Sequence, residues 1–152
     1  MELVEKQLSF GPRIPDSEGH AAFIEWAKEY LKIFGWTVQA EPENWRGKEI
    51  INIIAERDPV PDDTPWIILG AHYDTRTFAD EDAIDRKSEP VPGANDGASG
   101  VAVLLKLAET LPDNLNKRIT LALFDAEDQG NITGWGEWCI GSSILAEQIK
   151  TG

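Results

Sequence analysis

Two short apolar runs on either side of a helix-forming stretch constrain the fold more than any other feature of this chain. One run covers residues 66–69 directly after Pro65, and the other extends from Ile119 to Phe124. Apolar residues recur between them at helical spacing: Val101, Leu104, Leu105, Ala108 and Leu111. A strand, a helix over about 98–111 and a second strand form a right-handed crossover with parallel strands. Unbroken apolar runs are typical of strands covered on both faces, so we expect both strands in the interior of a sheet.

The rest of the pattern adds elements around this unit. A helix is predicted from about Ser17 to Phe34 and ended by Gly35, because apolar and aromatic side chains fall on one helical stripe. Alternating residues at 36–40 and an apolar stretch at 49–57 predict two paired strands. The last predicted segments are a long polar loop and a short helix, at 75–91 and 142–150. Strands that alternate with helices predict an α/β fold.

Length and charge exclude several classes of protein. The 152 residues are enough for one domain with a core of its own. The formal net charge of −13 argues against a nucleic-acid partner, because phosphate binding needs clustered Lys and Arg. No apolar stretch approaches the roughly 20 residues that span a bilayer, and the first residues do not form a signal peptide, so we expect a soluble chain of unassigned location. The single cysteine, Cys139, excludes an intrachain disulfide and is expected in the core.

Three short acidic or histidine-containing segments follow the predicted strands or open the predicted helix. His72 and Asp74 come after the first strand. Glu127 and Asp128 come after the second strand, and Asp96 precedes the helix between them. Ligands of open α/β sheets bind beyond the carboxyl ends of the strands, so we expect these five side chains to lie together. Imidazole and carboxylate groups bind zinc, and a spare carboxylate can move protons when the zinc activates water.

Each segment also has an ordinary structural interpretation. A single histidine is more often a hydrogen-bonded structural residue than a metal ligand. Asp96 is a residue type that commonly caps a helix at its start. Glu127 and Asp128 on a strand end would point to different sides, so that one can bind metal while the other moves protons. An acidic surface loop would carry the same pair without any function.

Four stretches of the chain form a more specific joint pattern: GPRIPDSEGH at 11–20, NIIA at 52–55, GAHYDT at 70–75 and PGANDGASG at 92–100. Together they resemble the M28 family of zinc peptidases, which includes aminopeptidases acting on free N-termini and, as close relatives, the glutaminyl cyclases. The resemblance implies a zinc-exopeptidase-like, three-layer α/β/α fold with a mixed, mostly parallel sheet. It also implies that residues 1–152 form a single, incomplete domain that is truncated at the C-terminus.

Carried over position by position, the resemblance implies a role for each of these side chains. His72 would bind one zinc ion, Asp96 would bridge two, and Asp128 would bind the other. Glu127 would be the general base, and Asp74 would orient His72. The family more often has a second glutamate where this chain has Asp128, and aspartate is shorter but still a good zinc ligand. One or two Zn²⁺ ions are therefore the implied cofactors.

The activity implied by the resemblance is the release of N-terminal residues from peptide substrates. Zinc lowers the pKa of bound water from 15.7 towards about 7, and Glu127 would take its proton as the water attacks the peptide carbonyl. In a glutaminyl-peptide cyclotransferase of the same fold, the same groups would polarise a glutamine side-chain amide and shuttle a proton from the substrate's amino group. The Trp-bearing stretch at 134–142 is similar to the corresponding stretch of cyclase-like members of the family. Two tryptophans that simply pack in the structure would give the same pattern. The residues that bind the substrate side chain are not assigned.

The chain lacks part of the ligand set that the resemblance implies. The family has a further Asp and a late His after the general base, whereas the two histidines of this chain are His20 and His72. The late His is absent, and neither zinc reaches the three protein ligands usual for a catalytic site. We therefore expect the amino-terminal part of a longer enzyme, either a gene fragment or a truncated chain, with a missing carboxy-terminal segment.

A protein of a different class would fit the same residues. The family also includes members whose peptidase-like domain has lost its metals and serves in binding. In such a protein the acidic segments have no catalytic role, and a partner or self-association covers the apolar surface left by absent strands. A stable dimer or complex without zinc would distinguish this binding domain from an enzyme.

Overall fold

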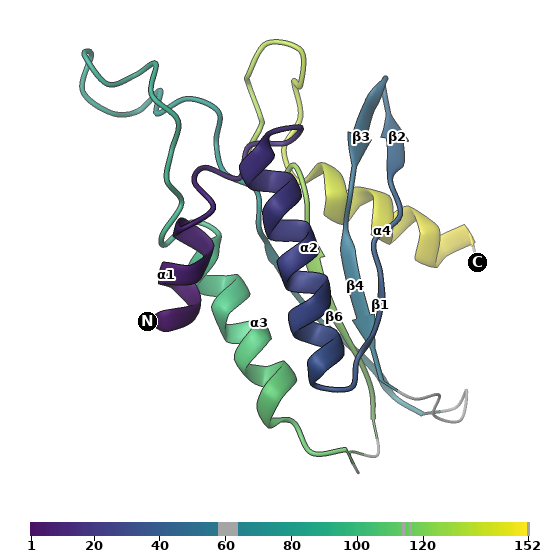
Figure 1. Cartoon of the computed structure of the whole chain (residues 1–152). Helices are drawn as coiled ribbons and strands as arrows, with labels where there is room; N and C mark the ends of the chain where they lie inside the picture. The colour runs from purple at the N-terminus through teal and green to yellow at the C-terminus, as the bar shows by residue number, and fades with distance from the viewer. Residues whose placement is uncertain (58–63, 114, 116, 152) are drawn as a thin grey trace.

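The computed structural model describes residues 1–57, 64–113, 115 and 117–151 (Figure 1). Its helices are α1 (Glu2–Leu8), α2 (Glu18–Ile33), α3 (Ala98–Thr110) and α4 (Ile140–Thr151). Its strands are β1 (Thr37–Gln39), β2 (Glu43–Trp45), β3 (Lys48–Ile50), β4 (Ile53–Glu56), β5 (Trp66–His72) and β6 (Arg118–Phe124). Across these described ranges, no helix combines the length and the apolar character needed to cross a bilayer.

Four of the strands form one mixed sheet in the order β1-β4-β6-β5. β5 and β6 are parallel, with α3 between them in the chain, so the predicted crossover is confirmed. β4 pairs antiparallel with both β1 and β6, and β2 and β3 form a separate antiparallel hairpin. The described sheet is therefore mixed, as predicted, but not mostly parallel, because β5 and β6 form its one parallel pair.

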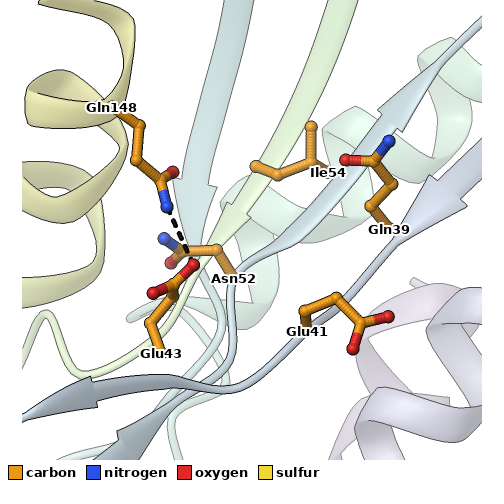
Figure 2. Close-up of a pocket in the computed structure, with 6 residues that line it drawn as sticks. All are labelled: Gln39, Glu41, Glu43, Asn52, Ile54 and Gln148. Atoms are coloured by element: carbon orange, nitrogen blue, oxygen red, sulfur yellow. Dashed lines mark hydrogen bonds between the residues drawn. The ribbon is translucent and has the colours of Figure 1, made fainter. Parts of the chain in front are cut away.

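Helices cover both faces of this sheet (Figure 1). Ile53 and Ala55 of β4 are fully buried in one core with apolar residues of α2 and α3. Ile54, between them, lines a pocket on the other face together with Gln148 of α4, which donates to Glu43 Oε1 at 2.9 Å (Figure 2). Alternate residues of a strand point to opposite faces, so α4 lies opposite α2 and α3. The chain thus has the three α/β/α layers predicted for it.

The longest helix, α2, packs beneath the segment that follows β5. The helix begins after Ser17, whose side chain accepts a hydrogen bond from a backbone amide of the first turn, and ends before Gly35. Gly35 has a φ of +79°, a conformation that favours glycine. Within the helix, Phe23 is fully buried and stacks on Tyr73, with ring centroids 4.9 Å apart. This packing fixes the position of the residue next to His72.

The prediction that the strand after Pro65 lies in the sheet interior is wrong for the described part of the chain. There, β5 pairs with β6 alone and stands at the end of the strand order. Trp66, Ile67 and Ile68 are 40%, 40% and 37% exposed. An apolar run shows that a strand is suited to burial. It does not show whether the described residues supply a second strand to pair with it. Much of the apolar surface of β5 is therefore uncovered by the described residues.

Other differences from the prediction lie at element boundaries. The sequence pattern did not predict α1, which is too short to show a clear helical period. The stretch predicted as one strand at 49–57 divides into β3 and β4, because Ile51 and Asn52 leave the ladder to bind Asp125. The Ile51 amide donates to Asp125 Oδ2 (2.9 Å), and Asn52 Oδ1 accepts from the Asp125 amide (3.1 Å). The loop at 75–91, which is described throughout, contains no helix or strand, as predicted.

Candidate metal centre

Three segments from different parts of the chain meet at the carboxyl ends of β5 and β6. His72 is the last residue of β5, and Asp96 lies just before the start of α3. Their side chains are in contact, with His72 Nε2 2.7 Å from Asp96 Oδ1. Glu127, in the turn after β6, places its Oε2 3.9 Å from the same nitrogen. These three predicted site residues therefore lie together in the structure.

Carboxylates on several sides set the charge of the His72 imidazole. His72 Nδ1 is buried and lies 3.4 Å from Asp74 Oδ1, within ion-pair range but without a hydrogen bond. Burial lowers the pKa of His72, but the carboxylates of Asp74, Asp96 and Glu127 outweigh this effect and raise the pKa to about 9. Without a metal, the imidazole is therefore protonated at neutral pH and pairs with these carboxylates.

Asp128 belongs to the same concentration of negative charge. Burial is the largest effect on the pKa of Asp128, and repulsion from Asp96 and Asp74 comes next. Together they raise this pKa to about 6, although the positive charge of Arg76 acts to lower it. Arg76 Nη1 lies 3.6 Å from Asp128 Oδ1 and donates to the Asp128 carbonyl oxygen at 3.1 Å. Carboxylates that repel one another are stabilised when a cation binds between them. The electrostatics of the site therefore favour a positively charged ligand.

Asp74 holds the turn after β6 in place from inside the protein. Its side chain is fully buried. Asp74 Oδ1 accepts from the Glu127 amide (2.9 Å), and Oδ2 accepts from the Asp128 amide (3.2 Å) and from Gln129 Nε2 (3.0 Å). The sequence predicted that Asp74 orients His72; the hydrogen bonds that Asp74 makes in the structure go to the turn, whose backbone it holds. A carboxylate that accepts several N–H donors makes strong, charge-assisted bonds.

The Glu127 carboxylate has a second neighbour that the sequence did not predict. Cys139 Sγ donates to Glu127 Oε1 at 3.2 Å, and the Cys139 amide donates to the Glu127 carbonyl oxygen at 3.0 Å. The hydrogen bond with Glu127, together with burial, raises the pKa of the thiol. Cys139 is exposed, so the prediction of a core cysteine is wrong. Cys139 has a positive φ of 57° and directly precedes α4, beside Glu127.

A buried hydrogen-bonded group lies next to the site residues. His20 Nε2 is 2.9 Å from Asp125 Oδ1 and 3.0 Å from Tyr73 Oη, and Tyr73 Oη donates to the Ile51 carbonyl oxygen at 2.8 Å. The three residues are no more than 4% exposed. His20 therefore binds neighbours of the predicted ligands and links them to α2. The sequence did not predict these hydrogen bonds, because residue type does not reveal hydrogen-bond partners. Its one signal for them was that Tyr73 and Asp125 stand near predicted site residues.

The donor atoms fit zinc in kind but form an incomplete set. Imidazole nitrogen and carboxylate oxygen are both common zinc ligands. Two ligands at about 2.1 Å on one tetrahedral ion lie about 3.4 Å apart, so the 2.7 Å contact between His72 and Asp96 would need to open by several tenths of an ångström. In the described ranges, no group of three or more His, Cys, Asp or Glu side chains is arranged to hold a metal ion. The types of donor therefore suit zinc, whereas their arrangement in the described residues does not make up a site.

The mixed sheet, with imidazole and carboxylates beyond the ends of its strands, defines an α/β protein of the zinc-exopeptidase class. The chain belongs to peptidase family M28, which matches residues 52–151. The resemblance recognised in the sequence is therefore confirmed.

Comparisons with individual proteins support the same assignment. The glutaminyl cyclase of Porphyromonas gingivalis is 36% identical, with a TM-score of 0.85 over 95% of this chain and 52% of that one. A leucine aminopeptidase precursor from Bacteroides thetaiotaomicron is 33% identical, with a TM-score of 0.81 over 95% of this chain and 54% of that one. A probable zinc metalloprotease of Pyrenophora tritici-repentis is 32% identical over 66% of this chain and 19% of its own length. The chain thus spans about half the length of these solved structures and less of the curated relative.

Proposed function

We propose that the chain supplies part of a zinc centre in which His72, Asp96 and Asp128 are ligands and Glu127 moves protons. The observation that carries this proposal is the meeting of His72, Asp96 and Glu127 at one point from three separate segments. The crowding that raises the pKa of Asp128 to about 6 supports it, because a bound cation relieves that repulsion. The name of the Pyrenophora protein supports zinc as the metal.

The proposed substrate is a peptide whose free N-terminus enters the site. Zinc, when bound, supplies positive charge that polarises an amide carbonyl of this substrate. Glu127 takes a proton from the attacking nucleophile and returns it to the leaving nitrogen. Asp74 holds the Glu127 amide at 2.9 Å and so keeps the carboxylate of Glu127 beside His72. The acidic surroundings also attract a cationic N-terminus.

The first candidate activity is cyclisation of an N-terminal glutamine. The substrate's own amino group attacks its side-chain amide carbonyl, a C–N bond closes the ring, and the amide nitrogen leaves as ammonia after receiving the proton. Similarity to the Porphyromonas glutaminyl cyclase supports this activity. Trp138 supports it further, because the residue is 46% exposed, although Arg76 lies over its ring, and because it directly precedes Cys139, the thiol partner of Glu127. An exposed indole at this position is suited to pack against a small amide side chain.

The second candidate is hydrolysis of the first peptide bond, as the sequence predicted. Water replaces the substrate amine as the nucleophile, and the same proton transfers through Glu127 release a free amino acid. Similarity to the Bacteroides leucine aminopeptidase precursor favours this activity. Both candidates need further zinc ligands, which we propose come from a segment equivalent to the second half of the relatives or from a partner chain.

Zinc titration of the purified chain by calorimetry tests the proposed centre. We expect weak binding that is lost in Asp96→Asn and in Asp128→Asn. Asp113→Asn is the matched control, because Asp113 is 96% exposed and pairs with Arg57 away from the site. Zinc binding that neither site variant changes would contradict the assignment. A stable dimer without zinc affinity would favour a binding domain instead.

Product analysis distinguishes the two activities. A glutaminyl peptide and a leucyl peptide are incubated with the zinc-loaded protein in its longest available form. Ammonia release with the peptide bond intact identifies cyclisation, whereas a free amino acid identifies hydrolysis.

A further inference from the structure

Arg13 is a buried cation that contacts both motifs of the proposed metal centre. We infer that Arg13 is a positioning residue that sets the separation between the His72 segment and the Asp96 segment. This inference rests on the proposed zinc centre. It concerns a residue that would touch neither metal nor substrate.

The side chain of Arg13 donates to both segments at once. Nε donates to the Tyr73 carbonyl oxygen at 2.9 Å, directly after His72. Nη2 donates to the Gly93 carbonyl oxygen at 2.8 Å, and Nη1 lies 3.4 Å from the Pro92 carbonyl oxygen. The planar guanidinium holds its donors in a fixed geometry. These hydrogen bonds therefore set the distance between the two segments.

The backbone of Arg13 adds to the same connection. Its carbonyl oxygen accepts from the Thr75 amide at 3.1 Å. Gly93 has a φ of +68°, and a Cβ built there would lie 2.9 Å from Arg13 Nη2. The loop carrying Gly93 therefore packs closely on the guanidinium, and a side chain at this position would collide first with Thr75 Cγ2 and the Asp96 carbonyl oxygen and then with Arg13.

The burial and the charge of Arg13 mean that its side chain is held in one position. Arg13 is 0% exposed, and burial lowers its pKa to about 10 against the opposing charge of Asp74. A buried guanidinium is costly unless its donors are satisfied and an opposite charge is near. Here the carbonyl groups satisfy the donors, and Asp74 supplies the charge. The same carboxylate accepts from the Glu127 and Asp128 amides, so the charge that acts on Arg13 belongs to the residue that holds the third segment of the site.

A second arginine provides a matched comparison within the chain. Arg57 Nη1 donates to the Leu111 carbonyl oxygen at 2.7 Å, and Nη2 donates to that of Ala108 at 3.1 Å. These carbonyl groups belong to the C-terminal end of α3, whereas the site lies at its start. Loss of either arginine removes hydrogen bonds to backbone carbonyls, but only Arg13 joins segments that carry predicted ligands.

The experiment compares Arg13→Met and Arg13→Lys with Arg57→Met in the full chain. Zinc affinity is measured by calorimetry, and stability by urea unfolding. We expect Arg13→Met to weaken zinc binding by about 10- to 100-fold, the range found for groups that orient metal ligands. Arg13→Lys keeps the charge without the forked donors, so its affinity should be intermediate. Arg57→Met should lose stability while its zinc affinity stays within about twofold of the unmodified chain.

Amide hydrogen exchange on the metal-free protein gives a readout that does not need zinc. The Ala98 amide donates to the Gly93 carbonyl oxygen at 3.2 Å and therefore reports the position of the Asp96 loop. We expect faster exchange at Ala98 and Thr75 in both Arg13 variants, and unchanged exchange there in Arg57→Met. If Arg13→Met does not fold, Arg13→Lys carries the comparison.

The outcomes separate this inference from the proposed function. An unmodified chain that binds no zinc overturns the proposed centre, whereas faster exchange at Ala98 and Thr75 would still support the link made by Arg13. An unmodified chain that binds zinc, with Arg13 variants that bind it equally well, overturns the inference alone. Equal loss of zinc affinity in Arg57→Met would reduce Arg13 to a general contributor to stability.

Discussion

Replacing the buried Asp74 with asparagine tests whether one carboxylate holds the site together. The change keeps the size and shape of the side chain but removes its charge and one acceptor oxygen. In the structure, both carboxylate oxygens accept hydrogen bonds: Oδ1 from Glu127, and Oδ2 from Asp128 and Gln129. Whichever way the asparagine amide points, its NH₂ group faces a backbone N–H donor of this turn.

The expected loss of stability follows from these contacts. One buried backbone N–H loses its acceptor, which costs about 1–3 kcal/mol. The remaining bonds lose their charge assistance, and Arg13 loses the negative charge that acts on it in the interior. We expect the free energy of unfolding to fall by about 3–5 kcal/mol in total, because these losses add to the cost of the unpaired N–H. At a typical denaturant dependence, this lowers the urea midpoint by roughly 2 M.

Urea unfolding followed by tryptophan fluorescence measures the effect, since the chain has 6 tryptophans. Asp113→Asn is the control, because it removes an exposed carboxylate that is paired with Arg57. The double variant Arg13→Met with Asp74→Asn leaves no unpaired buried charge, so its loss should be smaller than the sum of the single losses. A loss below about 1 kcal/mol in Asp74→Asn, or strict additivity in the double variant, would refute the reasoning.

Three further predictions follow from the site. Gly97→Ala should cost about 1–3 kcal/mol and weaken zinc binding in calorimetry, because a Cβ there would lie 2.9 Å from the His72 ring and collide with the His72 carbonyl oxygen. The metal-free chain should lose stability as the pH rises from about 6.5 to about 9, because His72 has a raised pKa and binds its proton more tightly when folded; urea midpoints across this range should flatten in His72→Gln. Cys139 should react slowly with iodoacetamide, and Glu127→Gln should speed the reaction, because the Glu127 carboxylate raises the pKa of the thiol.

The helices and strands that position the site were predicted more accurately from the sequence than the contacts between its side chains. The crossover through α3 followed from apolar spacing, and parallel strands necessarily bring His72 and the turn after β6 to the same edge. The contact between His72 and Asp96 was expected for this reason. The hydrogen bonds from Asp74 to the turn were not, because they depend on the direction of individual backbone amides in an irregular segment.

The errors have identifiable physical causes. Cys139 was expected in the core because cysteine is often buried, but it lies exposed just before α4, where its thiol binds Glu127. The hydrogen bonds of Arg13 were not predicted, because nothing in a sequence shows which carbonyl groups a buried guanidinium will bind. The edge position of β5 was missed, since strand order depends on the whole sheet and not on the strand's own residues.

The edge position of β5 also affects how this chain behaves at high concentration. In the described residues, one side of the strand has no neighbour, and Ile68 is 37% exposed beside Trp66. An apolar strand edge of this kind can pair with the same strand of another molecule, which leads to ordered aggregates. A lysine in place of Ile68 would put a charge on this strand at a position that is already partly in solvent. The substituted chain should stay monomeric at the concentrations that calorimetry needs.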